Sequence, residues 1–229
     1  PNTPIVGENA FAHESGIHVH GVLSKAFCYE PLTPKLVGRE SEIVVGKHTG
    51  LHAVEKKLKD FGIGLTKEQI LEIVDDVKQI RESGKKITDE DLIAIAAGYV
   101  GKVPDEEKEV KLEEMSIISG LHITPTATAI LNINGNKKVG SNIGNGAVDA
   151  ALNALKSVVP EKITLEEYRL EAITGGSDAL CQVSVKMTNE DGIKALGKSV
   201  GPDIVMTSVN AAIEAINKLR KISKEGKTK

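Results

Sequence analysis

Apolar residues between positions 50 and 100 recur every three to four residues, the spacing of helices that are buried along one face. The first such segment runs from His52 to Phe61, and Gly62 ends it. The second carries one apolar stripe and ends near Gly84; the stripe consists of Ile70, Leu71, Val74, Val77 and Ile80. A third segment runs from Thr88 to Tyr99, so three helices are predicted here.

Two of these helices begin with a capping box, in which a Thr and a residue three positions later satisfy each other's backbone amides. Thr66 with Gln69 marks the start of the second helix, and Thr88 with Asp91 marks the start of the third. Residues 1–50 contain many Gly and Pro and no long helical period. We expect mostly loop there, with a short helix near residues 17–23.

The rest of the chain contains an internal repeat. At an offset of 57 residues, matching pairs include Asn134 and Asp191, Gly140 and Gly197, Gly144 and Gly201, and Asn153 and Asn210. Further upstream, Leu112-Glu113-Glu114 matches Leu165-Glu166-Glu167 at an offset of 53. One small insertion reconciles the two offsets, so the sequence contains two copies of one structural unit.

Each copy of the repeat reads strand, strand, strand, helix. Alternation of apolar and polar residues over 126–133 and 181–187 predicts a strand in each copy. Helical spacing over 147–158 and 204–222 predicts a helix in each. Asn134-Gly135 is a strong hairpin signal. We expect each helix to cover the apolar face of its own sheet, and the small units to pair with each other or with a second chain.

The predicted fold class is therefore α+β, with small, mostly helical accessory subdomains followed by a duplicated β-β-β-α domain. The expected limits are 1–50, 51–107 and 108–229. The second limit lies in a charged, Pro-containing stretch, Lys102–Val110.

Composition narrows the function classes. The 229 residues are 40% hydrophobic and 27% charged, as in a soluble globular protein. A net charge of −3 and 3% aromatic residues without Trp argue against a nucleic-acid partner. No apolar run approaches the roughly 18 to 20 residues that cross a membrane. The two cysteines lie far apart, which suits a reducing, cytoplasmic location. Because Pro1 replaces an initiating Met, we expect a piece of a longer polypeptide.

Histidine is concentrated near the start, with five of six within the first 52 residues. His18 and His20 could both ligate a metal, but a zinc site needs three or four ligands and no familiar spacing completes one. We therefore expect no metal site in this chain. One of these histidines could act as an acid, a base or a hydrogen-bond donor. The alternative is a loop histidine satisfied by backbone groups.

Glycine-containing turns precede both helices of the repeat, at Gly144-Asn145-Gly146 and at Gly201-Pro202-Asp203. Helix N-termini carry free N–H groups and a partial positive charge, so they can hold a small carboxylate. The turn from Gly175 to Ala179 could supply a further wall. These turns indicate either a small-anion or amino-acid site, or tight turns that only cap the helices.

Several motifs resemble one enzyme family. GENAFAHESGIH at 7–18, Tyr29-Glu30-Pro31, Val37-Gly38 and GKHTG at 46–50 resemble the region after the catalytic barrel in 2-isopropylmalate, citramalate and homocitrate synthases. GNGAVDAALNAL at 144–155 and YRLEAITGGSDA at 168–179 resemble the C-terminal regulatory, or LeuA dimerisation, domain of that family. The resemblance covers essentially the whole chain.

The resemblance implies the role of each candidate residue. The family condenses acetyl-CoA with a 2-oxo acid, on a barrel that also holds a divalent metal. His18 and Tyr29 match the histidine and tyrosine that reach the catalytic barrel of the partner subunit. The regulatory domain of the family binds leucine or isoleucine near a homodimer interface. That implies an effector site, which we place around Gly144, Gly146, Ala147, Ala151, Thr174, Gly175 and Ala179.

This chain would then be the accessory and regulatory part of a 2-isopropylmalate synthase-like acyltransferase. It would hold no cofactor of its own and would be inactive alone, because barrel motifs for the metal and acetyl-CoA are absent from it. Citramalate synthase with isoleucine as effector and homocitrate synthase are alternatives within the family. A stand-alone amino-acid-sensing module is the alternative from another class.

Overall fold

The computed structural model describes residues 12–13, 34–38, 42–43, 51–82, 87–173, 175–176 and 179–227. The chain divides into two compact units, residues 1–99 and residues 100–229. In the part of the first unit that the structure describes, two short parallel strands are present, β1 (Ala12–His13) and β2 (Glu42–Ile43), together with the 3-10 turn η3 (Pro34–Val37). The helix expected near residues 17–23 lies outside the described residues. The expected limits at 50 and 107 stay predictions.

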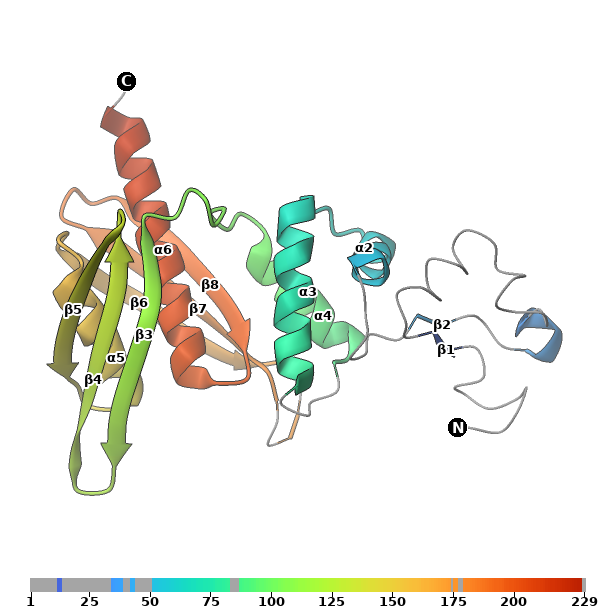
Figure 1. The fold of residues 1–229 in the computed structure, drawn as a ribbon, viewed down its shortest axis with the longest axis horizontal. Coiled ribbons are helices and arrows are strands. Elements are labelled where there is room, and N and C mark those ends of the chain that lie inside the picture. Colours follow the sequence, from blue (N-terminus) through green and yellow to red (C-terminus); the bar gives the residue numbers. More distant parts are fainter. Residues whose placement is uncertain are drawn as a thin grey trace. The chain divides into compact units, whose positions relative to one another are not determined.

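The first unit contains the three predicted helices, α2 (Leu51–Asp60), α3 (Lys67–Glu82) and α4 (Asp89–Tyr99) (Figure 1). Both capping boxes are confirmed. The Thr66 amide donates to Gln69 Oε1 (3.0 Å), and the Gln69 amide donates to Thr66 Oγ1 (3.3 Å). Thr88 and Asp91 exchange the same pair of bonds at 3.0 and 3.2 Å. These bonds satisfy amides that a helix leaves unpaired at its first turn.

The predicted stripe on α3 is wrong at one position. Leu71 has 51% of its surface exposed, whereas Ile73 is fully buried. Successive residues are about 100° apart around a helix, so Leu71 turns away from the face that carries Ile70. Ile73 follows Ile70 by three residues and returns to that face.

The second unit is the predicted α+β module, two three-stranded antiparallel sheets with one helix each (Figure 1). The first copy consists of β3 (Val110–Gly120), β4 (Ile123–Ile133), β5 (Asn136–Ile143) and α5 (Ala147–Val158). The second consists of β6 (Ile163–Ala172), β7 (Cys181–Asn189), β8 (Lys194–Gly201) and α6 (Ile204–Lys227). The order in each sheet is sequential, β3-β4-β5 and β6-β7-β8.

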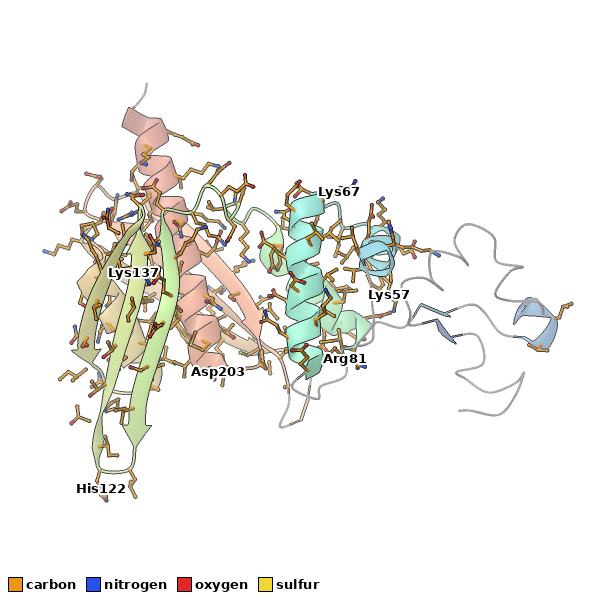
Figure 2. The ribbon with its side chains drawn as sticks, in the orientation of Figure 1. Lys57, Lys67, Arg81, His122, Lys137 and Asp203 are labelled. Carbon is orange, nitrogen blue, oxygen red and sulfur yellow. The ribbon has the colours of Figure 1, made fainter. Side chains whose placement is uncertain are left out.

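The hairpin predicted at Asn134-Gly135 is present between β4 and β5. Both residues have positive φ, 52° and 83°, which a two-residue hairpin turn of this kind requires. The matching turn differs, because Asn189 closes a longer loop by accepting the amides of Asp191 and Ile193 on its side-chain oxygen. At the opposite end of the first sheet, His122 with a φ of 61° lies at the tip of the β3–β4 hairpin (Figure 2).

The two copies share a close contact between the helix and a glycine of the third strand. A Cβ on Gly140 would lie 2.3 Å from Val158 Cγ2 and 3.3 Å from the Ala154 carbonyl oxygen. A Cβ on Gly197 would lie 2.0 Å from the Ala211 carbonyl oxygen, and Ala211 matches Ala154 at the offset of 57. Each helix thus lies directly on a glycine of the third strand, which only a residue without a side chain permits.

A cross-strand ion pair is also duplicated. Glu113 pairs with Lys137 in the first sheet, and Glu166 pairs with Lys194 (2.8 Å) in the second (Figure 2). Hydrogen bonding from the lysine holds the pKa of each glutamate below its ordinary value. The sequence offsets of 53 and 57 predict these matches, because Glu113 matches Glu166 and Lys137 matches Lys194.

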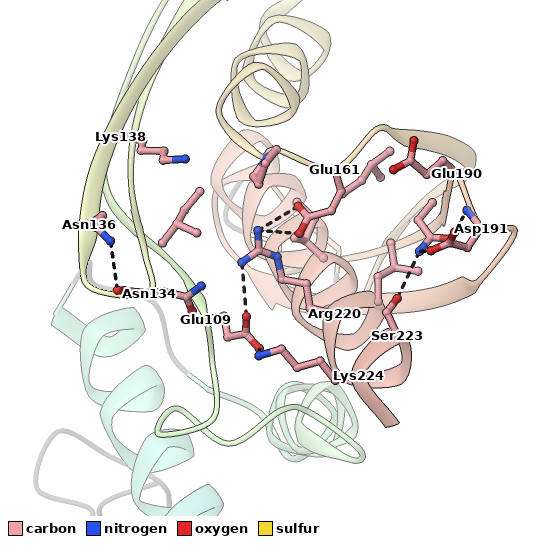
Figure 3. Close-up of a pocket in the computed structure, with 16 residues that line it drawn as sticks. Glu109, Asn134, Asn136, Lys138, Glu161, Glu190, Asp191, Arg220, Ser223 and Lys224 are labelled. Carbon is pink, nitrogen blue, oxygen red and sulfur yellow. Dashed lines mark hydrogen bonds and ion pairs between the residues drawn. The ribbon is translucent and has the colours of Figure 1, made fainter. Parts of the chain in front are cut away.

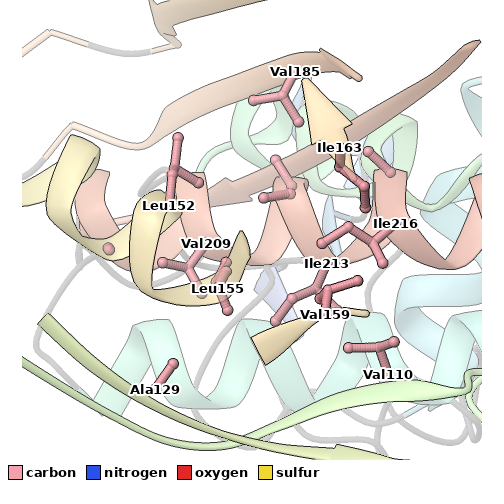
Figure 4. Packing of buried hydrophobic residues seen from close by; sticks show 14 of the residues in the cluster. Val110, Ala129, Leu152, Leu155, Val159, Ile163, Val185, Val209, Ile213 and Ile216 are labelled. Atoms are coloured by element: carbon pink, nitrogen blue, oxygen red, sulfur yellow. The ribbon is translucent and has the colours of Figure 1, made fainter. Parts of the chain in front are cut away.

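One hydrophobic core joins the two copies. Helices α5 and α6 pack on each other and lie between the sheets, as Figure 4 shows from close by. The core is formed by the inward side chains of both sheets and by both helices, among them Ala129, Leu155, Val185, Val209 and Ile216. Every residue from Ala211 to Asn217 is buried, which is typical of a helix surrounded on all sides.

Candidate functional site

Of the predicted site residues, His18, Tyr29 and Thr174 lie outside the described residues. Four others belong to the turn between β5 and α5 and to the first turns of that helix: Gly144, Gly146, Ala147 and Ala151. The remaining two, Gly175 and Ala179, lie in the loop between β6 and β7.

Gly144 holds the β5–α5 turn against its helix. Its amide donates to the Pro125 carbonyl (3.0 Å), and a Cβ there would lie 2.2 Å from the Ala150 amide nitrogen. Gly146 is the N-cap of α5, with extended backbone and open space where a side chain would be. The turn is therefore tight on its inner side at Gly144 and open on its outer side at Gly146.

The two helix starts differ in how their amides are capped. Asp203, which matches Gly146, accepts the Met206 amide on its side chain (2.8 Å), so α6 carries its own N-cap (Figure 2). Helix α5 has no side-chain hydrogen bond from its N-cap residue. Since first-turn amides need an acceptor, the start of α5 is the better place for the carboxylate of a ligand.

Asp149 adds a negative charge to the first turn of α5. Its Oδ2 accepts the Asn145 amide (2.8 Å), and its Oδ1 accepts from the Asn153 side chain (3.3 Å), which also donates to the Ile143 carbonyl (3.1 Å). A simple anion would be repelled here. A zwitterion could instead place its ammonium group toward Asp149 and its carboxylate toward the helix amides.

Strand register places Gly175 and Ala179, the predicted effector residues of the β6–β7 loop, near the start of α6. Cys181, at the start of β7, pairs with Gly201, the last residue of β8, and Ile204 begins α6 three residues later. Gly175 and Ala179 precede Cys181 and therefore lie at that end of the second sheet. The predicted effector residues thus divide between the helix starts of the two copies.

Sequence reasoning missed Tyr168 on β6, whose hydroxyl lies 2.7 Å from Ser208 Oγ on α6. Tyr168 and Leu170 are on the helix side of the second sheet, yet 36% and 42% of their surfaces are exposed, because α6 packs on β7 and β8. A bulge between Leu165 and Glu167 reverses the alternation along the strand. Accounting for that bulge would have revealed this apolar surface.

A cavity of about 490 Å³ lies at the other end of the module (Figure 3). It is lined by the β4–β5 and β7–β8 turns, by the segment before β6 and by the C-terminal half of α6. Its central cation, Arg220, pairs with Glu161 (2.8 Å) and Glu109 (3.6 Å). These charges are matched within the protein, so we do not assign the cavity a ligand.

Comparison with known families decides the identity. Residues 86–220 match the LeuA allosteric (dimerisation) domain, and residues 5–85 match the homocitrate synthase post-HMGL domain-like family. The chain belongs to the LeuA allosteric domain family. The matched residues include both sheets, α5 and α6 as far as residue 220.

Individual relatives carry the names of two synthases. The chain is 50% identical over 222 residues to a probable 2-isopropylmalate synthase of Methanopyrus kandleri, and 47% identical over 223 residues to the 2-isopropylmalate synthase of Methanocaldococcus jannaschii. It is 46% identical over 221 residues to a putative (R)-citramalate synthase of Methanothermobacter thermautotrophicus. Each match covers 96% of this chain and 43–44% of the relative, so the chain spans less than half the length of these proteins.

Two further observations apply to the described residues of this LeuA-type chain. The described residues include no group of three His, Cys, Asp or Glu side chains placed to bind a metal. None of the helices formed by these residues is both long enough and apolar enough to span a bilayer.

Proposed function

We propose that this chain is the accessory and regulatory part of an acyltransferase that condenses acetyl-CoA with a 2-oxo acid, as a 2-isopropylmalate synthase does. The observation that carries the proposal is the order of the two family matches, which together run from residue 5 to residue 220. The protein works as a homodimer, and a branched-chain amino acid inhibits it. A divalent metal and acetyl-CoA bind to the catalytic barrel that the resemblance implies.

His18 and Tyr29 are proposed to complete the catalytic site of that barrel. An imidazole and a phenol can polarise or protonate a thioester carbonyl as it enolises. The motif GENAFAHESGIH and the position of Tyr29 eleven residues after His18 support this assignment.

The effector is proposed to bind at the start of α5. Three features support this placement: the absence of a side-chain cap at Gly146, the open space beside it, and the Asp149 carboxylate in the first turn. Ala147 is partly exposed, and its small side chain leaves room beside the turn for a branched aliphatic group, whereas Ala151 is fully buried in the core and would support the site from behind. Gly175 and Ala179 would contribute from the other copy or from the partner subunit.

Calorimetry on Asp149→Asn tests the effector site. Leucine and isoleucine are each titrated into the chain, together with 4-methylpentanoate, which is leucine without its amino group. Asparagine keeps the acceptor for the Asn145 amide but removes the charge, so we expect leucine affinity to fall about tenfold or more. The affinity for 4-methylpentanoate should stay equal or rise. Equal loss for both ligands, or no binding by the wild type, would reject the site.

A citramalate synthase with isoleucine as effector is the second candidate. The 46% identity to the putative (R)-citramalate synthase favours it almost as strongly as the 2-isopropylmalate synthase matches favour the first. The ratio of leucine to isoleucine affinity in the same titration separates the two, since a misplaced methyl group in a fitted pocket costs roughly 1–3 kcal/mol. A stand-alone amino-acid sensor would bind the same ligands without an associated acyltransferase.

A further inference from the structure

The segment from Val100 to Glu109, which we call the arm, connects α4 to β3 and is held by one face of α6. Glu214, Asn217, Arg220, Lys221 and Lys224 provide this face, which we call the polar face. Their spacing of three to four residues places them along one side of the helix. The polar face is joined to the arm by several hydrogen bonds and ion pairs.

The inner part of the polar face is buried. Glu214 and Asn217 each have 3% of their surface exposed. Glu214 Oε1 accepts the Val103 amide at 2.8 Å. Asn217 Oδ1 accepts the amides of Glu109 and Val110 at 2.9 and 3.0 Å, and its Nδ2 donates to the Val110 carbonyl at 2.8 Å. Asn217 therefore fixes the point where the arm becomes β3.

The outer part consists of ion pairs. Lys221 pairs with Glu107 (2.8 Å), and Lys224 pairs with Glu109 (2.6 Å). Figure 3 shows Arg220 between Glu109 at the end of the arm and Glu161 just before β6. The end of the arm and the start of the second copy are thus joined through one guanidinium group.

A buried polar face is not the arrangement that would stabilise α6 most simply, because apolar side chains could fill the same positions. Among the described residues, Glu214 Oε2 and Arg220 Nε are buried without a hydrogen-bond partner. Well-packed apolar side chains often replace buried charges at no cost in stability. Helix α5 ends at Val158, and Pro160 occupies the position that matches Asn217, so the first copy does without such a face. The polar face therefore serves the arm.

We propose that the arm and the polar face form a coupling joint, which transmits the state of the regulatory module to the N-terminal unit. A hydrogen bond weakens when its two atoms move apart by a fraction of an ångström or when its angle changes by tens of degrees, whereas apolar contacts tolerate such shifts. A joint made of hydrogen bonds therefore responds to small shifts of α6. Helix α6 begins at the end of the second sheet that carries Gly175 and Ala179. This inference rests on the proposed function only for the identity of the effector.

The N-terminal unit ends at Tyr99, the residue before the arm, and the contacts of Tyr99 can receive such a displacement. The arm follows directly on Tyr99, whose carbonyl accepts from the Gln69 side chain (3.0 Å) and whose hydroxyl donates to Asp76 (2.6 Å). Gln69 is the capping-box residue of α3. A displacement of the arm would therefore act on both α4 and α3.

Amide hydrogen exchange on the whole chain tests the joint with and without saturating leucine. Asn217→Ala removes one bond to Glu109 of the arm and two bonds to Val110, the first residue of β3, and Asn210→Ala removes the same side chain from an exposed position of α6. Without ligand, we expect Asn217→Ala to speed exchange at Glu109 and Val110 about tenfold and to change exchange in α3 and α4 about threefold. Asn210→Ala should match the wild type.

In the wild type, leucine should change the rate of amide exchange in α3 and α4. In Asn217→Ala, leucine should leave these rates unchanged, although calorimetry should find the same leucine affinity for both proteins. Lys224→Glu, a surface change that repels Glu109, should act in the same direction if Asn217→Ala does not fold. Unchanged exchange in α3 and α4 of the folded variants would overturn the joint. If leucine does not bind the wild type, the effector proposal fails, and the ligand-free exchange still decides the joint.

Discussion

Single residues decide where this fold tolerates change. Gly144 and Gly197 are glycines because a helix backbone occupies the place of their side chains, whereas Gly146 faces open space in an extended conformation. All three look alike in the sequence. What separates them is the distance to the neighbouring helix, which depends on tertiary packing.

Gly197→Ala is expected to destabilise the regulatory module by roughly 1–3 kcal/mol or more. Its Cβ would lie 2.0 Å from the Ala211 carbonyl oxygen and 2.6 Å from the Ala215 amide nitrogen, and these backbone atoms cannot turn aside. Gly146→Ala is the matched control and should stay within about 0.5 kcal/mol of the wild type. Native-state amide exchange of β7 and α6 measures both. Equal stability of the two variants would contradict the close packing.

At the scale of elements, the sequence predicted most of the helices and the repeat. The capping residues Thr66 and Thr88 fixed two helix starts, and the bounds 147–158 of α5 were predicted as they occur. Periodicity failed where a polar residue is buried. The helical spacing over 204–222 does not indicate that Glu214 and Asn217 are buried, because only the arm, distant in sequence, explains their burial. The candidate site was placed by resemblance rather than by periodicity.

The duplicated ion pair predicts a pH-dependent element. The pKa of Glu166 is lowered in the folded state, chiefly by hydrogen bonding from Lys194. Its contribution is therefore present above the ordinary value of 4.5 and is lost as the pH falls through the folded pKa. Glu166→Gln should lower Tm at neutral pH, by a small amount because the pair is exposed.

The Tm difference between Glu166→Gln and the wild type should close as the pH falls below 4.5. Glu171→Gln, which removes the same charge from the same strand, gives the effect of net charge alone. Thermal melts followed by circular dichroism over this pH range provide the comparison. A Tm difference that is the same at neutral and acidic pH would show that the ion pair does not stabilise the sheet.

At the scale of the whole molecule, the two copies differ most on the outer faces of their sheets. The outer face of the second sheet is charged, with Glu167, Arg169 and Lys186 among its side chains. The outer face of the first sheet carries exposed apolar residues, Ile118, Val139 and Ile143. Because the two copies share one fold but differ on their outer surfaces, we infer that the outer faces of the two sheets are in contact with different environments. An exposed apolar patch like that on the first sheet is typical of a protein interface.

We expect the chain to be a homodimer through the first sheet, and the repeat supplies its own control. Val139 and Leu196 occupy matching positions and are 66% and 47% exposed. Val139→Lys places a charge in the proposed interface, so sedimentation velocity at micromolar concentration should change from dimer to monomer. Leu196→Lys adds the same charge to a face that already carries Lys186, and it should leave the dimer intact. A monomeric wild type would exclude the first sheet as a dimer interface. Equal dissociation of the Val139→Lys and Leu196→Lys dimers would also exclude it, because only Val139 lies on the first sheet.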